Sequence, residues 1–240
     1  MTRDLPTPAR ALAVAAHPDD AEFGCGGTLA KWASSGCEVS HLVLTDGSKG
    51  SWDPAQPADE LVSVREGEQR TAAAVVRRDA PGEVHFLGWV DGELVSGLEQ
   101  RERVAWWIRR LRPDVVLGHD PWKRYRLHPD HRHAGFLVTD GTVAARDPHF
   151  FPEHDVAPHR PRALLLWESD APDHVEDISR FVDVKLDALL AHRSQHASTM
   201  GITSTEGIEQ FRRRMTDRAA RDGRRAGVAH GEAFKLIGET

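Results

Sequence analysis

The sequence contains no asparagine, and this absence removes every N-glycosylation sequon. Cysteine is nearly absent too, because only Cys25 and Cys37 occur among the 240 residues. The residues between them have a helical pattern, and ~12 residues of helix at 1.5 Å rise would place the two thiols roughly 18 Å apart. A disulfide requires Cα atoms within about 7 Å. We therefore expect two free thiols, which fits a reducing compartment such as the cytoplasm.

Long apolar runs are also missing. The longest run, residues 11–16, is six residues long, whereas a membrane span needs about 18. The first ten residues contain prolines and no apolar core, so they do not match a signal peptide. These absences predict a cytoplasmic protein without a membrane span.

Lysine is scarce as well, since there are five lysines and 26 arginines, and the formal net charge is −6. Because the arginines are scattered and the chain is acidic overall, we do not expect it to bind nucleic acid. The shares of hydrophobic residues (40%) and charged residues (28%) are ordinary for soluble globular proteins. A chain of this length can bury a sizeable core, and nothing in its composition demands a second unit. We therefore expect a single domain over residues 1–240.

Strand-like apolar runs alternate with helical patterns along the chain. The expected strands are residues 11–16, 38–45, 83–87, 114–119 and 163–167. The expected helices are residues 27–35, 59–78, 98–111, 130–145, 178–192 and 206–221. This alternation predicts an α/β fold, a Rossmann-like, doubly wound and mostly parallel sheet of about five strands with helices on both faces.

Against these absences stand 14 histidines, and two of them share a sequence context. Residues 17–20 read His-Pro-Asp-Asp and directly follow the first expected strand, while residues 128–131 read His-Pro-Asp-His and follow the fourth. A residue before proline is disfavoured in the α region, and proline suits the first turn of a helix. Each motif is therefore expected to end an extended segment at its histidine and to open a helix.

In doubly wound sheets the ligand crevice lies at the carboxyl ends of the strands, where the strand order reverses. If strands 11–16 and 114–119 flank that point, both motifs face one crevice. Two histidines with one or two aspartates there form the ligand set of a catalytic zinc that keeps a position open for water. The competing interpretation is coincidence combined with helix capping, and the residues alone do not decide whether Asp19 or Asp20 binds the metal.

The motifs also resemble those of a known family. Residues 16–24, with Gly-Gly-Thr-Leu at 26–29, are similar to the start of the LmbE-like (PIG-L) family of zinc-dependent de-N-acetylases. Further similar segments cover nearly the whole chain, namely 65–68, 88–94, 128–131, 192–195 and 231–234. The family includes deacetylases of N-acetylglucosaminyl lipids, of mycothiol and bacillithiol precursors, of chitobiose and of antibiotic sugars.

The resemblance implies a zinc centre with a catalytic group on either side of it. The implied zinc (Zn2+) ligands are His17, Asp20 and His131. Asp19 would be the general base that deprotonates the metal-bound water. His128 would stabilise the oxyanion or donate a proton, and Asp130 would orient and charge His128. This set agrees with the needs of amide hydrolysis, which requires an activated water, a base and a positive group at the carbonyl oxygen.

The resemblance also implies substrate contacts, which are assigned to Arg65, Asp91, Tyr125 and His230. Tyr125 stands three residues before His128, whereas some relatives have a tyrosine two residues before that histidine. A C-terminal histidine such as His230 reaches the substrate in some relatives, sometimes from a neighbouring subunit. Similar enzymes often assemble as trimers or hexamers, so a homo-oligomer is expected here.

The remaining histidines receive simpler interpretations. His192 and His196 have the i, i+4 spacing of a metal-binding helix, but no acid close in sequence completes a site. We expect them to be structural or on the surface. His119 ends the fourth expected strand and is a candidate for contact with a metal ligand.

Together these features predict a zinc-dependent hydrolase that removes an N-acetyl or related N-acyl group from an N-acetylglucosamine-type sugar. One alternative is an amidase of a thiol-sugar conjugate of the mycothiol type. The other is a non-catalytic sugar-binding module, which would tolerate the loss of motif residues, yet none is missing. The loops 46–57 and 147–161 are expected to select the substrate.

Overall fold

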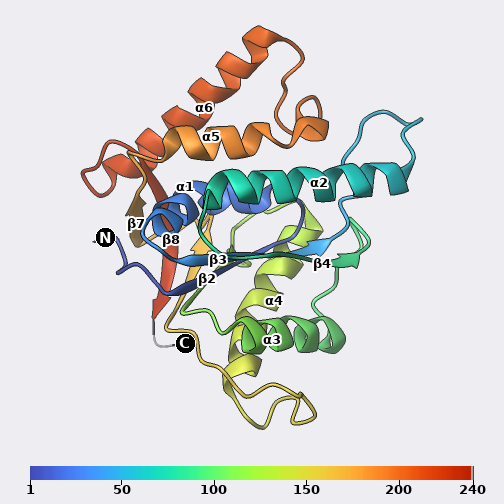
Figure 1. Ribbon diagram of the computed structural model, residues 1–240, viewed down its shortest axis with the longest axis vertical. Helices are drawn as coiled ribbons and strands as arrows, with labels where there is room; N and C mark the ends of the chain where they lie inside the picture. Colours follow the sequence, from blue (N-terminus) through green and yellow to red (C-terminus); the bar gives the residue numbers. More distant parts are fainter. Residues whose placement is uncertain (239) are drawn as a thin grey trace.

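The computed structural model describes residues 1–238 and 240 and shows a mixed eight-stranded sheet between two layers of helices (Figure 1). The strands are β1 (Thr2–Arg3), β2 (Arg10–Ala15), β3 (Glu38–Thr45), β4 (Val84–Trp89), β5 (Val115–His119), β6 (Ala163–Trp167), β7 (His174–Asp177) and β8 (Gly231–Gly238). The helices are α1 (Asp20–Ser34), α2 (Ala58–Arg77), α3 (Leu98–Leu111), α4 (Pro129–Arg146), α5 (Val182–Leu190) and α6 (Thr205–Arg224), with a short 3-10 turn at Arg193–Gln195.

The strand order is β1-β7-β8-β6-β5-β2-β3-β4. The chain runs from β2 outward through β3 to β4, then returns to the other side of β2 to form β5 and β6, and all five strands are parallel. The strand order therefore reverses between β2 and β5, which confirms the predicted doubly wound α/β fold. Both His-Pro-Asp motifs follow the two strands that flank this reversal.

The sheet has eight strands rather than about five, because β1, β7 and β8 form an additional edge. β8 runs antiparallel to β6 and β7, and β1 pairs with β7 in parallel. β1 and β7 are only two and four residues long, so neither gives a periodic signal in the sequence. The partner of β1 lies about 170 positions away in the sequence, as in the pair of Thr2 and His174.

Alternating side chains of β2 belong to two separate hydrophobic cores. Ala11, Ala13 and Ala15 pack with α1, α2 and α5, while Leu12 and Val14 pack with α3 and α4. Figure 1 shows these two helical layers above and below the sheet. The small alanines on one side let α1 lie close to the sheet, and α1 is the helix that carries the first motif into position.

Helix α1 begins at Asp20, seven residues before the expected start at residue 27. Gly24 and Gly26 were expected to precede the helix but lie inside it, where close approach of neighbouring elements leaves little room for larger side chains. A Cβ atom at Gly24 would lie 2.5 Å from the Trp167 ring, and one at Gly27 would lie 2.7 Å from Ile178. The second motif behaves as predicted, since His128 caps α4 and Pro129 occupies its first turn.

The loop 147–161 does not reach the crevice, contrary to expectation. It joins the end of α4 to the start of β6, at the amino ends of the strands, and His159 N–H binds the carbonyl of Ala145. The buried Arg109 fixes this loop by donating to several of its carbonyls, including those of Asp147, Phe150 and Phe151. The loop therefore stabilises the opposite end of the domain and has no contact with the site described below.

Cys25 and Cys37 are both free and buried, as expected. Among the described residues, no helix combines the length and the apolar character that crossing a membrane requires.

Candidate active site

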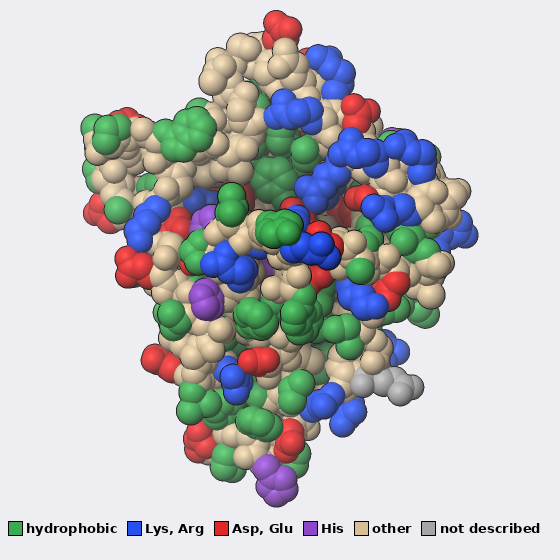
Figure 2. All heavy atoms as spheres, turned by 180° about the vertical axis from the view of Figure 1, so that it is seen from behind, with side chains coloured by type: hydrophobic (Ala, Val, Ile, Leu, Met, Phe, Trp, Pro, Cys, Tyr) green, Lys and Arg blue, Asp and Glu red, His purple; other side chains and the backbone are tan. Residues whose placement is uncertain are grey.

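A cavity of about 460 Å³ opens at the carboxyl ends of β2, β5 and β6. Both His-Pro-Asp motifs contribute to its walls, the first through His17, Asp19 and Asp20 and the second through His128 and His131. The other walls come from the loop after β3, the loop after β4, the end of β6 and helix α6. In the view from behind, Lys and Arg side chains gather in the upper half of the molecule and surround a hollow there (Figure 2).

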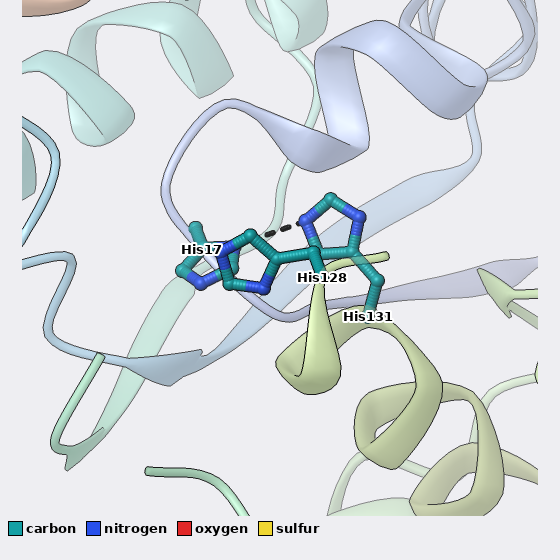
Figure 3. A group of neighbouring side chains, drawn as sticks. All are labelled: His17, His128 and His131. Carbon is teal, nitrogen blue, oxygen red and sulfur yellow. Dashed lines mark hydrogen bonds between the residues drawn. The ribbon is translucent and has the colours of Figure 1, made fainter. Parts of the chain in front are cut away.

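Three histidines from the two motifs lie together in this cavity (Figure 3). The Nδ1 atom of His17 lies 3.2 Å from the Nε2 atom of His131. The ring of His128 stacks on that of His131, with centroids 4.8 Å apart, and meets the ring of His17 edge-on at 4.6 Å. His17 is buried at the base of the cavity, whereas His128 is exposed at its mouth.

The predicted metal ligands His17, Asp20 and His131 form a triangle of side chains, the donor triangle, in which each oxygen of Asp20 faces a different histidine. His17 Nδ1 lies 3.2 Å from Asp20 Oδ2, and His131 Nε2 lies 3.3 Å from Asp20 Oδ1. Ligands bound tetrahedrally to zinc at ~2.0–2.1 Å would be separated by about 3.3 Å. Two imidazole nitrogens 3.2 Å apart also require a proton or a cation between them. These residues therefore fit a divalent metal ion.

Other groupings of possible ligands overlap this triangle. Side chains with donor atoms within 4.8 Å of one another include His17 with His128 and His131, and Asp20 with His119 and His131. The geometry also separates the two adjacent aspartates, because Asp20 faces the histidines while Asp19 faces Arg65, 3.5 Å away. Asp20 is thus the aspartate placed to bind metal, a choice that the sequence pattern left open.

The far nitrogen of His17 is held by two buried carboxylates. Its Nε2 atom lies 3.1 Å from Asp130 Oδ2 and 3.1 Å from Asp91 Oδ1. Burial alone would lower the pKa of His17, but the hydrogen bonds to Asp130, Asp20 and Asp91 raise it well above its usual value. A metal ion would replace the proton on Nδ1, while Nε2 would keep its proton for the two carboxylates, as in metal sites where a carboxylate orients the ligand histidine.

This arrangement corrects the expected role of Asp130. The resemblance implied that Asp130 orients and charges His128, but in the structure Asp130 contacts His17. Asp130 lies in the first turn of α4, fully buried, and the N–H groups of Gly92 (2.6 Å) and Leu94 (3.3 Å) fix its carboxylate. His128 stands at the N-cap position of α4 with its ring exposed, and the Asp130 carboxylate affects it through charge rather than through a hydrogen bond.

His119 supports Asp20 from behind. Its Nδ1 atom accepts a hydrogen bond from Trp167 Nε1 at 3.0 Å. Its Nε2 atom lies 3.3 Å from Asp20 Oδ2. Burial raises the pKa of the Asp20 carboxyl, but His131 and His119 outweigh this effect and hold the pKa well below its usual value.

Asp19 has the opposite electrostatic environment. Its carboxyl is fully buried in the wall of the cavity, and burial raises its pKa from 3.8 to about 6, although Arg65 counteracts part of this shift. A carboxylate with a pKa this close to neutrality is well suited to general-base chemistry. The pKa of His128 is lowered by partial burial and by the neighbouring His17, so its ring is neutral at neutral pH.

The four expected substrate contacts have different positions. Arg65 and Asp91 line the cavity, but both are at least 95% buried, and the Arg65 η-nitrogens bind the backbone carbonyls of Gly47 and Pro18. Tyr125 is 87% exposed and His230 lies at the start of β8, and neither belongs to the cavity wall. The structure therefore brings together the two motifs, Arg65 and Asp91, but not Tyr125 or His230.

Several residues at the site escaped the sequence analysis. Glu168 binds Arg126 and Arg218, and all three line the cavity. Its position directly after the expected strand 163–167 was the one signal in the sequence that could have identified it. Gln69 binds the backbone of Asp19, and Glu22 binds Gln69. His192, expected to be structural or on the surface, is fully buried with Nε2 3.4 Å from Glu22 Oε2.

The sequence model of the PIG-L family, described as GlcNAc-PI de-N-acetylase, matches residues 12–141, more than half of the chain. The protein belongs to the PIG-L family. The matched region contains both motifs and every residue of the donor triangle, which lies at the fold's crevice. The predicted family is thus confirmed, and so is the predicted reaction class, hydrolysis of an amide bond by an N-deacetylase.

Individual relatives of this PIG-L protein agree. Diacetylchitobiose deacetylase of Thermococcus kodakarensis is 38% identical over 189 residues, which cover 78% of this chain and 70% of that protein. A solved N,N'-diacetylchitobiose deacetylase from Pyrococcus horikoshii superposes with a TM-score of 0.86 at 28% identity, over 96% of this chain and 84% of that one. 1D-myo-inositol 2-acetamido-2-deoxy-alpha-D-glucopyranoside deacetylase of Actinosynnema mirum is 31% identical over 166 residues, 59% of this chain and 57% of that protein.

Proposed function

We propose that this protein removes the N-acetyl group from an N-acetylglucosamine-type sugar, with N-acetylated disaccharides of the chitobiose kind as its preferred substrates. One observation carries the proposal, namely the donor triangle of His17, Asp20 and His131 beside a carboxyl of raised pKa at Asp19. The two most informative relatives, at 38% and 28% identity, are both named for diacetylchitobiose.

We propose zinc as the metal at the triangle, with His17, Asp20 and His131 as its ligands. Two imidazoles and one carboxylate suit zinc, and three protein ligands leave a position open for water. Zinc bound there would act as a Lewis acid that lowers the pKa of a water molecule to about 7 and polarises the acetyl carbonyl.

Asp19 is the proposed general base. Its carboxylate lies in the cavity wall beside the triangle, where it takes the proton of the attacking water. The same group then returns the proton to the amine of the sugar as the carbon–nitrogen bond breaks. A pKa of about 6 suits both directions of this transfer at neutral pH.

His128 is the proposed electrophilic group at the mouth of the cavity. Its ring is exposed and projects from the start of α4 above His131. As a neutral imidazole it donates an N–H hydrogen bond to the carbonyl oxygen, on which negative charge develops. Asp130 and Asp91 act on the other side of the site by orienting His17.

The rest of the cavity offers room and polar groups for a sugar. Its volume of about 460 Å³ falls within the range of ~300–1,000 Å³ common for small-molecule sites. Glu168 after β6, Arg218 of α6 and Arg126 of the loop before α4 line one wall, and we assign this wall to the second sugar of a disaccharide. Lys49 of the loop 46–57 stands on the opposite side, so one of the two loops expected to choose the substrate does reach the site.

The proposal is tested by measuring acetate release from diacetylchitobiose, from monomeric N-acetylglucosamine and from an N-acetylglucosaminyl inositol, together with the zinc content of the purified protein. We expect about one zinc per chain and turnover that is fastest with the disaccharide. Acetate release from none of the three would reject the proposed substrate class. Asp19→Asn is the matched inactive control, because it preserves shape while removing the base.

A further inference from the structure

The peptide that links Pro18 to Asp19 is held at both of its polar atoms by one helix. Arg65 Nη2 donates to the carbonyl oxygen of Pro18 at 2.7 Å. The N–H of Asp19 donates to Gln69 Oε1 at 2.9 Å. Residues 65 and 69 lie one turn apart on α2, so both act from the same face. We call Arg65 and Gln69 the peptide clamp.

The held peptide has an unfavourable backbone conformation. Asp19 has φ 97° and ψ −27°, in the left-handed region that residues other than glycine rarely adopt. Such a residue persists only where its surroundings fix it, and such strain is concentrated at functional sites. The carbonyl of Asp19 adds only an ordinary first-turn bond from Phe23 N–H, at 3.1 Å. The peptide clamp therefore supplies the contacts that hold this conformation from outside the motif, beside the hydrogen bonds between His17 and Asp20 within the turn itself.

The Gln69 side chain can make its contacts in only one orientation. The Asp19 N–H is a donor, so the atom of Gln69 that faces it is the oxygen. The amide nitrogen of Gln69 then needs an acceptor, and Glu22 Oε1 lies 2.8 Å from it. Gln69 and Glu22 are both completely buried, and His192 Nε2 approaches the second oxygen of Glu22 at 3.4 Å. Glu22 thereby fixes the amide that in turn fixes Asp19.

We propose that Gln69, oriented by Glu22, is a positioning residue that holds Asp19 in its strained conformation and so aims the Asp19 carboxyl into the cavity. This inference rests on the proposed function, in which Asp19 is the base. Gln69 is not part of the cavity wall and has no exposed surface, so it touches no substrate and acts only through Asp19. A misplacement of a catalytic group by about 1 Å can cost on the order of 100-fold in rate.

The test compares wild type with Gln69→Met, which has a similar volume but neither donor nor acceptor. We expect kcat to fall on the order of 100-fold while KM and zinc content stay within about threefold of wild type. Amide hydrogen exchange of residue 19, followed by NMR in the metal-free protein, supplies a second measurement that needs no substrate. We expect this N–H to exchange faster in Gln69→Met than in wild type.

Two further variants separate positioning from general damage. The double variant Glu22→Gln, Gln69→Glu again places an acceptor at position 69, opposite the Asp19 N–H, and a donor at position 22, opposite position 69. Its kcat should be about tenfold or more above that of Gln69→Met. Val76→Ala is the matched control, because Val76 is buried on the same helix but packs in the hydrophobic core. It should lower the melting temperature and leave kcat unchanged.

The inference is overturned if Gln69→Met keeps kcat within about threefold of wild type, or if Val76→Ala loses as much kcat as Gln69→Met at a comparable melting temperature. It is also overturned if exchange at residue 19 is the same in wild type and Gln69→Met. Failure of the proposed function looks different, because wild type itself would then release no acetate. In that case the exchange measurement still decides whether Gln69 holds residue 19.

Discussion

Asp130 Oδ2 lies 3.1 Å from Nε2 of His17, across the sheet reversal that separates the two motifs. The contact joins a residue of the second motif to a metal-ligand candidate of the first. The N–H of Gly92 binds the same carboxylate oxygen at 2.6 Å, so the loop after β4 takes part as well. Three segments that are distant in sequence thus fix the orientation of a single imidazole ring.

This contact predicts that Asp130→Asn weakens zinc binding. Asparagine has no charge and presents a weaker acceptor or an NH₂ group to His17 Nε2, so the ring is oriented less firmly and Nδ1 is less basic. Loss of such a partner typically costs about 10–100-fold in metal affinity. We expect the zinc Kd to rise by that factor in a competition titration with a chromophoric chelator. The control is Asp140→Asn on the same helix, a half-buried position whose carboxylate pairs with Arg101. Equal Kd values in both variants would contradict the assignment.

A second prediction separates the roles of the two histidines of the second motif. His128→Gln should keep full zinc content, because His128 lies outside the donor triangle at the exposed mouth of the cavity. Its kcat should fall about 100- to 1,000-fold, the usual cost of losing one donor to a developing oxyanion. Metal analysis and steady-state kinetics on the same preparation measure both quantities. His133→Gln, further along α4 and bonded to Ser96, should match wild type. Loss of zinc from His128→Gln would make His128 a ligand instead.

The adjacent aspartates predict opposite effects on stability. The pKa of Asp19 is raised from 3.8 to about 6 in the folded protein, so the folded state binds this proton more tightly than the unfolded state. The contribution of Asp19 to the free energy of unfolding is therefore lost as pH rises from about 4 to 6. Above that range, ionised Asp19 destabilises the fold by on the order of 3 kcal/mol. In metal-free protein at pH 8, Asp19→Asn should raise the free energy of unfolding by a few kcal/mol, and by little at pH 4.

Asp20→Asn is the counterpart of this experiment. The pKa of Asp20 is held well below 3.8, so its carboxylate stabilises the fold above that pH and this contribution is lost as the pH falls through the folded-state value. Asp20→Asn should consequently lower the free energy of unfolding at pH 8. Urea denaturation of both variants at pH 4 and pH 8 measures the signs. A shift of the same sign for both aspartates at pH 8 would show that their environments are not opposed.

The sequence alone predicted the doubly wound fold and the approach of His17 to His131, because strong local signals were available. Each motif joins a buried apolar strand to a helix, and parallel strands place such junctions at one edge of the sheet. The motif residues alone could not choose between Asp19 and Asp20, although the resemblance implied Asp20. The choice depends on the left-handed backbone at Asp19, which α2 contacts from another part of the chain.

Residues that act through distant partners were beyond sequence reasoning. His192 was set aside because no acid lies near it in sequence, yet Glu22 meets it from 170 positions away. The expected pairing of Asp130 with His128 came from the family resemblance, but the buried Asp130 carboxylate contacts His17 instead. Tyr125 adopts φ 59° in an exposed turn, and its side chain is not part of the cavity wall. No sequence pattern indicates this backbone conformation.

The wall at the end of β6 predicts how the protein selects its substrate. Arg218 of α6 donates to Glu168 Oε1 at 3.3 Å, and both line the cavity together with Arg126. If this wall holds the second sugar, Arg218→Met removes a charged donor to its hydroxyl groups. A hydrogen bond to a charged group contributes about 1.5–3 kcal/mol, so KM for diacetylchitobiose should rise about tenfold or more.

The same change should leave kcat unchanged and KM for monomeric N-acetylglucosamine within about twofold, because the reacting sugar lies at the other end of the cavity. Arg212→Met is the control on α6, since Arg212 pairs with Asp187 outside the cavity. Initial-rate measurements with both sugars separate the possible outcomes. An equal rise of KM for both substrates would place Arg218 at the reacting sugar. A fall in kcat would instead mean that Arg218 acts on His119 through Glu168 and Arg126. His119 lies against Asp20, so such a change would reach the donor triangle.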